Sequence, residues 1–247
     1  MLLRSERSAY HKGVLPNRGV LMIEFYGGYE VYSESGVDLT LLRDNLKRSA
    51  TERLRDNQRM LPLIEELRRS GRAKFPDEAQ QVRRQGMVEP EALLRQLADH
   101  HVEYVMIGGL AMIVHGSTHI IKVLDVCYSR TQKNIAALAA AFAPLHPSLR
   151  GAPPGLSFSF DVPTIQVGLN FTLITDSGNV DVLGEVTGIG KYEQALAQSE
   201  EKTVYDLKVP VLAFDALLVS KKAAGRTQDR LHILELEELK QMLEGNS

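Results

Sequence analysis

The sequence predicts an α/β (α+β) fold, in which a mixed β-sheet is flanked by helices and preceded by a helical module. From residue 89 onward, short β-branched and aromatic runs alternate with apolar helical segments. Between residues 38 and 71 the chain is instead rich in Leu, Arg and Glu at helical spacing. The first pattern indicates strands interleaved with helices, and the second indicates helices alone.

Composition limits the class of protein. The 247 residues include 29 Lys and Arg against 31 Asp and Glu, so the net charge of -2 gives no global argument for non-specific nucleic-acid binding. A single cysteine, Cys127, excludes an intrachain disulfide framework and fits a reducing compartment. No run of about 18 apolar residues is present, and charges interrupt the N-terminus. We therefore expect a soluble, cytoplasmic protein with no membrane contact.

Four segments follow from these patterns. Residues 1–37 form an extension that is compatible either with a short hairpin around Gly27-Gly28 or with disorder. Residues 38–71 predict a helical hairpin, with a capping box in the run SATE at 49–52. Residues 72–88 are polar, contain Pro and Gly, and predict a linker. Residues 89–247 form the α/β domain.

Within that domain each element has its own signal. Pro90 predicts the first turn of a helix. The run EYVMIG predicts a strand that ends at Gly108-Gly109, and LAMIVHG predicts the helix after it. Further strands are predicted in KVLDVCYS, VGLNFTLIT, NVDVLGEV and YDLKVPVLAF, and further helices in TQKNIAALAAAFAPL, DALLVSKKAAG and the final run from Arg226.

The two glycines at the strand-to-helix junction give the first functional hint. Glycines at the start of a helix let the backbone approach a ligand closely, and the free N–H groups there favour phosphate. A tight turn without a ligand has the same sequence, so the pair alone is a weak signal.

The residues that follow sharpen this hint. The run GGLAMIVHGSTHIIKVLDVCY places a Gly-Gly turn and a short apolar helix before a strand that carries an acidic residue. It resembles the nucleotidyltransferase superfamily that includes DNA polymerase beta, and within it the minimal and abortive-infection toxin-type enzymes. The resemblance continues through LNFTLITDSGNVDVLGEV and LLVSKKAAGRTQD, and so covers about the last 150 residues.

The resemblance implies roles for seven residues. Gly108 and Gly109 match the phosphate-binding pair, and Asp125 matches the second Asp of a D-x-D metal motif. Asp181 matches the third metal-binding carboxylate. Lys221 and Lys222 match positions that contact the triphosphate, and Asp229 matches an acidic position near them. The implied cofactor is Mg²⁺, which prefers carboxylate oxygens.

The sequence also departs from the family pattern. Val123 stands where the first metal-binding aspartate is expected, and valine cannot bind a metal ion. Ile121 and His119 stand where Thr and Arg are expected shortly before it. Either the chain is a degenerate member, a pseudoenzyme, or a neighbouring group such as Asp161 or Glu185 substitutes.

The leading functional hypothesis is therefore a nucleotidyltransferase of the toxin–antitoxin type, impaired by Val123. An intact relative would transfer a nucleoside monophosphate from an NTP to RNA, such as tRNA, or to a protein acceptor. An antitoxin-like partner, or regulation in cis by the N-terminal helices, is implied with it. One alternative is a non-catalytic protein that binds a nucleotide or a partner, and another is a scaffold that binds a partner through those helices.

Overall fold

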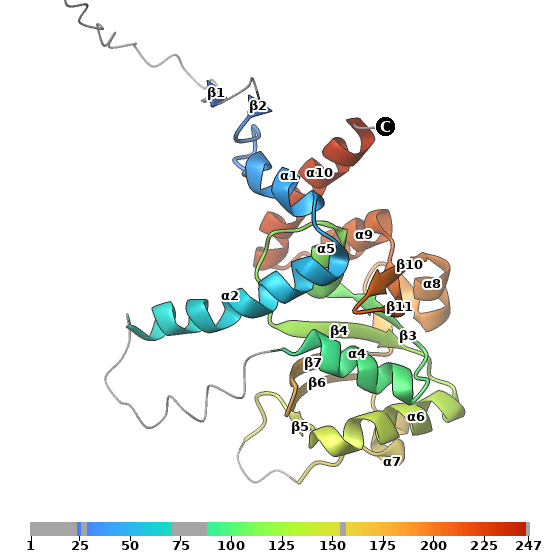
Figure 1. Ribbon diagram of the computed structural model, residues 1–247. Helices are drawn as coiled ribbons and strands as arrows, with labels where there is room; N and C mark the ends of the chain where they lie inside the picture. The colour runs from blue at the N-terminus through green and yellow to red at the C-terminus, as the bar shows by residue number, and fades with distance from the viewer. Residues whose placement is uncertain (1–23, 26–28, 71–87, 154–156, 246–247) are drawn as a thin grey trace, which may run out of the picture.

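The computed structural model describes residues 24–25, 29–70, 88–153 and 157–245 (Figure 1). Near the N-terminus, β1 (Glu24–Phe25) pairs antiparallel with β2 (Tyr29–Glu30), where the sequence is compatible with a short hairpin. The Gly27-Gly28 pair between these strands lies outside the described residues, as does most of the linker predicted at 72–88.

Two helices follow in the segment where the sequence predicts a helical hairpin. α1 (Leu39–Leu46) begins at Asp38, whose side chain accepts hydrogen bonds from the Thr40 and Leu41 N–H groups. α2 (Ala50–Ser70) begins with the predicted capping box. Its Ser49 N–H donates to Glu52 Oε2 at 2.8 Å, and the Glu52 N–H donates to Ser49 Oγ at 3.3 Å. Gly71, the last residue of the predicted hairpin, lies outside the described residues.

A seven-stranded mixed sheet forms the centre of the α/β region, with strand order β10-β11-β3-β4-β7-β6-β5. β4 pairs parallel with β7, and β11 pairs parallel with β3, whereas the other neighbours are antiparallel. The strands are β3 (Tyr104–Ile107), β4 (Val123–Tyr128), β5 (Ser148–Leu149), β6 (Asn170–Thr175), β7 (Gly178–Leu183), β10 (Ser199–Val204) and β11 (Leu207–Leu212). Between β7 and β10 lie the short pair β8 (Glu185–Val186) and β9 (Gly190–Lys191) and the helix α8 (Tyr192–Ala197).

Most of these elements lie where the sequence predicts them, and β10 and α8 are the main additions. β10 reads SEEKTV, a polar run that lacks the apolar alternation of the other strands. It forms because it pairs along its whole length with β11, from Ser199 opposite Leu212 to Val204 opposite Leu207. The structure of β10 depends on its pairing with β11, and its own sequence does not predict a strand.

Helices cover both sides of the sheet. Figure 1 shows α4 (Pro90–Asp99), α6 (Gln132–Phe142) and α7 (Val162–Val167) on one side, with α5 (Gly108–His115) and α9 (Phe214–Ala224) on the other. The chain ends in α10 (Thr227–Gly245), which packs on α9. Within the described ranges, no helix is both long and apolar enough to cross a bilayer.

The side chains of β7 alternate between a buried and a half-exposed face, and residues 123–126 of β4 do the same. Val180 and Val182 of β7 are fully buried, as are Leu124 and Val126 of β4. The residues between them point to the opposite face of the sheet, because successive side chains of a strand alternate. That face is only partly covered, and it carries the polar residues of β4 and β7.

The N-terminal helices hold the segment that leads into β4. The Asn57 amide of α2 donates to the Ile121 carbonyl and accepts from the Ile121 N–H, both at 2.8 Å. The Asn45 amide donates to the carbonyls of Gly116 and Ser117 at 2.9 Å. Residues 116–121 are thus fixed by side chains of α1 and α2, together with Glu235 of α10, rather than by a neighbouring strand.

We predict that Asn57→Ala destabilises the protein by about 1–3 kcal/mol, because both backbone groups of Ile121 lose their partner. The free energy of unfolding, measured in urea, would report the loss. Glu66→Ala, an exposed change on the same helix, is the matched control and should stay within about 0.5 kcal/mol of the wild type. Equal unfolding free energies for the two variants would contradict this role of Asn57.

Candidate functional site

Two carboxylates lie side by side at the centre of the sheet. Asp125 of β4 is paired in register with Asp181 of β7, and on its other side with Ile107, the last residue of β3. Adjacent strands are about 4.8 Å apart, so the two side chains emerge next to each other from the half-exposed face. Val123, two residues earlier on β4, is paired with Asn179 and presents a methyl surface to the same face.

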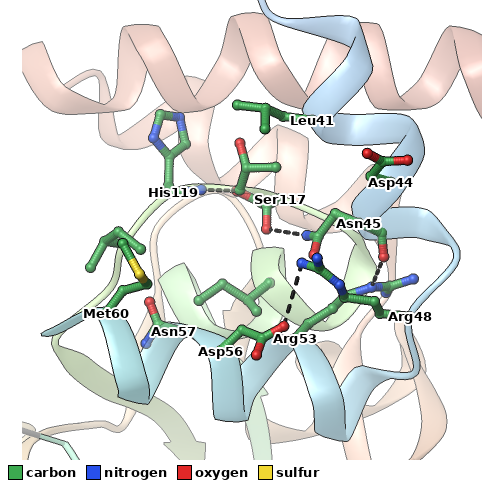
Figure 2. Close-up of a pocket in the computed structure, with 13 residues that line it drawn as sticks. Leu41, Asp44, Asn45, Arg48, Arg53, Asp56, Asn57, Met60, Ser117 and His119 are labelled. Atoms are coloured by element: carbon green, nitrogen blue, oxygen red, sulfur yellow. Dashed lines mark hydrogen bonds and ion pairs between the residues drawn. The ribbon is translucent and has the colours of Figure 1, made fainter.

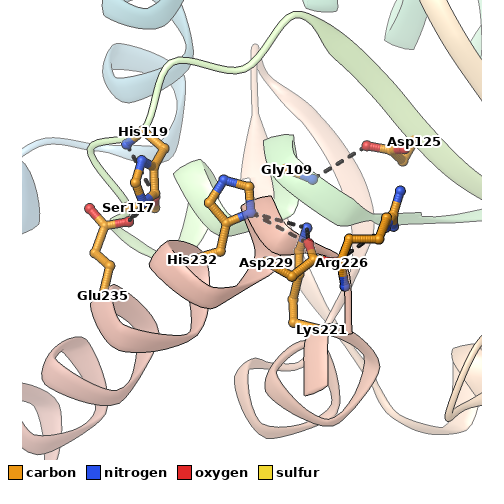
Figure 3. Close-up of polar contacts among 9 residues, drawn as sticks. All are labelled: Gly109, Ser117, His119, Asp125, Lys221, Arg226, Asp229, His232 and Glu235. Atoms are coloured by element: carbon orange, nitrogen blue, oxygen red, sulfur yellow. Dashed lines mark hydrogen bonds and ion pairs between the residues drawn. The ribbon is translucent and has the colours of Figure 1, made fainter. Parts of the chain in front are cut away.

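The Gly108-Gly109 turn lies directly against Asp125. Gly108 has φ +66°, and a Cβ atom at this position would overlap the Asp125 carboxyl group. The Gly109 N–H donates to Asp125 Oδ2 at 3.3 Å, as Figure 3 shows. At Gly109 itself, a Cβ would lie 2.6 Å from Ile121 Cγ2. Close packing therefore disfavours a side chain at either glycine. The Gly109 N–H points to Asp125, which with Asp181 forms a pair that we call the carboxylate row.

Arg150 completes the other side of the row. It follows β5, and its Nη2 donates to Asp181 Oδ1 at 2.6 Å. The two side chains keep 31% and 20% of their surface exposed, so the ion pair is partly shielded from water. Sequence analysis did not single out Arg150, because its position depends on the pairing of β5 with β6.

Burial is the largest influence on the pKa of both carboxyl groups. It raises the pKa of Asp125 to about 7, with a further increase from the charge of Asp181. The Gly109 N–H and the positive charges of Lys221 and Arg226 act in the opposite direction. Burial also raises the pKa of Asp181, and Arg150 offsets part of that increase. The pair therefore holds a proton more readily than two exposed aspartates would.

A cationic cluster from α9 and the turn before α10 faces this row. Lys221 Nζ is buried and donates to Asp229 Oδ1 at 3.1 Å, and Arg226 Nε donates to Asp229 Oδ2 at the same distance. Burial would raise the pKa of Asp229, but Lys221 and Arg226 hold it below its usual value. Figure 3 shows the Arg226 side chain extending toward Asp125.

Lys222 does not join this cluster. It is exposed on the far side of α9 and forms an ion pair with Glu237 of α10 at 2.7 Å. Of the seven residues predicted for the site, the structure thus brings Gly108, Gly109, Asp125 and Asp181 together, with Lys221 and Asp229 beside them. The roles assigned to all seven stay predictions.

A second polar cluster, which sequence analysis missed, adjoins Lys221. His232 of α10 lies 3.4 Å from Lys221 Nζ, and its ring packs edge-on against His119 at 4.6 Å between centroids. Burial and the charge of Lys221 lower the pKa of His232 to about 4. His119 lies 3.3 Å from Glu235, which also binds Ser117 (Figure 3). This cluster ties α10 to the turn after α5.

The implied magnesium site can be tested against these donors. Val123 contributes no oxygen, and Asp181 is already engaged by a guanidinium. Neither suggested substitute helps: Asp161 caps α7 by accepting from the Thr164 N–H, and Glu185 is exposed in β8. Among the described residues, no group of three or more His, Cys, Asp or Glu side chains is placed to hold a metal ion. The donor set does not fit a two-metal centre.

Comparison with known proteins gives little beyond this geometry. No family model matches the chain, and no curated protein matches it. Among solved structures it is similar to a protein from Thermotoga maritima that is described as a "putative nucleotidyltransferase". The two are 16% identical with a TM-score of 0.37, over 65% of this chain and 97% of that one. So distant a likeness carries no argument about function.

A separate cavity of about 270 Å³ lies between α1, α2 and the turn after α5. Figure 2 shows Arg48, Arg53, Asp56, Asn57 and His119 around it. Most of its polar groups already have partners: Arg48 pairs with Asp56 at 3.4 Å, and Arg53 donates to three backbone carbonyls. The cavity is therefore lined by side chains that hold the N-terminal helices in place.

The raised pKa of Asp125 predicts a pH dependence. The folded protein binds this proton up to pH of about 7, whereas an unfolded Asp releases it near 3.8. Between these values the unfolded state binds fewer protons, so the contribution of Asp125 to stability falls as pH rises. We expect Asp125→Asn to gain stability relative to the wild type from pH 4 to pH 7. Urea unfolding at three pH values checks this, and a constant difference would contradict it.

Proposed function

We propose that this chain is a nucleotide-binding protein of the nucleotidyltransferase type, and that its transfer activity is impaired. The observation that carries the proposal is the row formed by Asp125 and Asp181, set against the N-terminus of α5 at Gly108-Gly109. The α5 N–H groups, Lys221 and Arg226 supply donors and positive charge for phosphate oxygens. The family resemblance of the sequence points to the same ligand class.

The N–H groups of α5, Arg226 and Lys221 would have different roles in nucleotide binding. The N–H groups at the start of α5 would contact a phosphate in place of the Asp125 carboxyl group, which now accepts the Gly109 N–H at 3.3 Å. Arg226 keeps 65% of its side-chain surface exposed and already acts on both Asp125 and Asp181. Its guanidinium would move to a phosphate oxygen at small cost, whereas the buried Lys221 would stay with Asp229 and hold α9 and α10 in register.

Transfer is the part of the family's chemistry that we propose is weakened. In transfer, an acceptor oxygen attacks the α-phosphorus, the bond to the β-phosphate breaks, and pyrophosphate leaves. Developing charge on those oxygens needs cations held by several carboxylates. Val123 offers no oxygen and Arg150 engages Asp181, so of the two carboxylates in the row Asp125 is the one without a cationic partner at hydrogen-bond distance.

The remaining parts of the proposal rest on the resemblance alone. They are a toxin–antitoxin role, tRNA or a protein as acceptor, and an antitoxin-like partner. The proposed location in the cytoplasm rests instead on the single cysteine. The division into a helical module at 38–71, a linker at 72–88 and a nucleotidyltransferase-like domain at 89–247 is likewise proposed. Regulation in cis by α1 and α2 is supported by their hold on residues 116–121, which lead into the strand of Asp125.

We predict that the protein binds at least one of the four NTPs, measured by equilibrium dialysis with radiolabelled nucleotide. Arg226→Ala should weaken this binding about tenfold, the equivalent of one charge-assisted hydrogen bond. Arg230→Ala, an exposed change on α10 four residues further along the chain, should leave it unchanged. Absence of binding at millimolar nucleotide, or equal effects of the two variants, would contradict the site.

The same samples test the transfer activity. Each α-labelled NTP is incubated with Mg²⁺ and either total tRNA or protein, using the wild type, Val123→Asp and Asp125→Ala. We expect little label transferred by the wild type and more by Val123→Asp. Efficient transfer by the wild type that is lost in Asp125→Ala would contradict the proposed impairment and show a working enzyme.

A further inference from the structure

Arg150 is held in place at both its backbone and its side chain. Its N–H donates to the Thr172 carbonyl of β6 at 2.9 Å, which continues the pairing of β5 with that strand. Its Nη2 donates to Asp181 Oδ1 at 2.6 Å. Thr172 is itself paired in register with Asp181. The guanidinium is therefore positioned over the carboxylate row by the sheet rather than by a free loop.

Two buried atoms on this face lack a partner. Within the described part of the chain, Arg150 Nη1 and Asn179 Oδ1 are buried atoms that form no hydrogen bond. Asn179 lies two residues before Asp181 on β7, so both side chains point to the same face. A buried donor or acceptor without a partner costs about 1–3 kcal/mol, so such atoms are seldom left unpaired in a site with no ligand.

The charges around the row need no added cation to balance them. Three carboxylates, those of Asp125, Asp181 and Asp229, meet three cations, those of Arg150, Lys221 and Arg226. A divalent cation at this place would have to displace Arg150 from Asp181 and would be repelled by its charge. A phosphate group, by contrast, would find a guanidinium with one free edge.

We propose that the Arg150 guanidinium is the resident cation of this site, and that its free edge binds a phosphate oxygen of a nucleoside phosphate without a divalent metal. The same ligand carries hydroxyl and amino donors that can satisfy Asn179 Oδ1. This inference rests on the proposed nucleotide binding for its ligand, but the claim that Arg150 excludes the metal stands on the protein alone.

The first arm of the test uses Mn²⁺ alone, whose free concentration is read from its electron paramagnetic resonance signal. We expect the wild type to bind no Mn²⁺ at millimolar concentration, and Arg150→Gln to bind it. Mn²⁺ bound by the wild type and lost in Asp125→Ala would overturn the proposal. So would an Arg150→Gln protein that keeps its thermal unfolding transition and still binds no Mn²⁺.

The second arm measures NTP binding in EDTA and in Mg²⁺. We expect the wild type to bind equally in both, and Arg150→Gln to lose about tenfold in EDTA. Arg150→Lys keeps the charge but not the forked geometry, so its NTP affinity should lie between those of the wild type and Arg150→Gln. This variant also controls for a folding defect in Arg150→Gln. Binding that requires Mg²⁺ would overturn the proposal. If no NTP binds, the proposed function fails, while the Mn²⁺ arm still decides the role of Arg150.

Discussion

The close contact between the Gly108 backbone and the Asp125 carboxyl group is the constraint on which the rest of the site depends. It fixes where β3 ends, because the chain must turn at a residue without a side chain. It also directs the Gly109 N–H to Asp125, and it limits the access of water to the Asp125 carboxyl group. The raised pKa of Asp125 follows from the same packing.

Around this contact, pairs of cationic and carboxylate side chains hold the rest of the site together. Arg150 reaches Asp181 from β5, and Lys221 and Arg226 meet Asp229 where α9 gives way to α10. The N-terminal helices reach the site through Ile121, because Asn57 binds the Ile121 backbone and the Ile121 side chain packs against Gly109. A movement of α2 would therefore be transmitted to the Gly108-Gly109 turn through two direct contacts.

The sequence predicted the parts of this arrangement that local patterns determine. Strand and helix signals located β3, α5, β4 and β7, and the register of Asp125 with Asp181 matches what a carboxylate pair on neighbouring strands requires. Arg150, Asn179 and Arg226 could not be found in this way. Their roles depend on β5, a strand of only two residues, and on the turn between α9 and α10. Lys222 shows the same limit, because adjacent lysines on a helix point in different directions and only one of them lies near the row.

The central claim, that the carboxylate row and the Gly-Gly turn form a nucleotide site, is tested most directly by amide hydrogen exchange. The full chain would be compared with and without each of the four NTPs, both in EDTA and in Mg²⁺. The account predicts slower exchange at residues 107–111 and 178–183 on nucleotide addition. Slowing confined to the cavity between α1 and α2, or no change with any nucleotide, would contradict it.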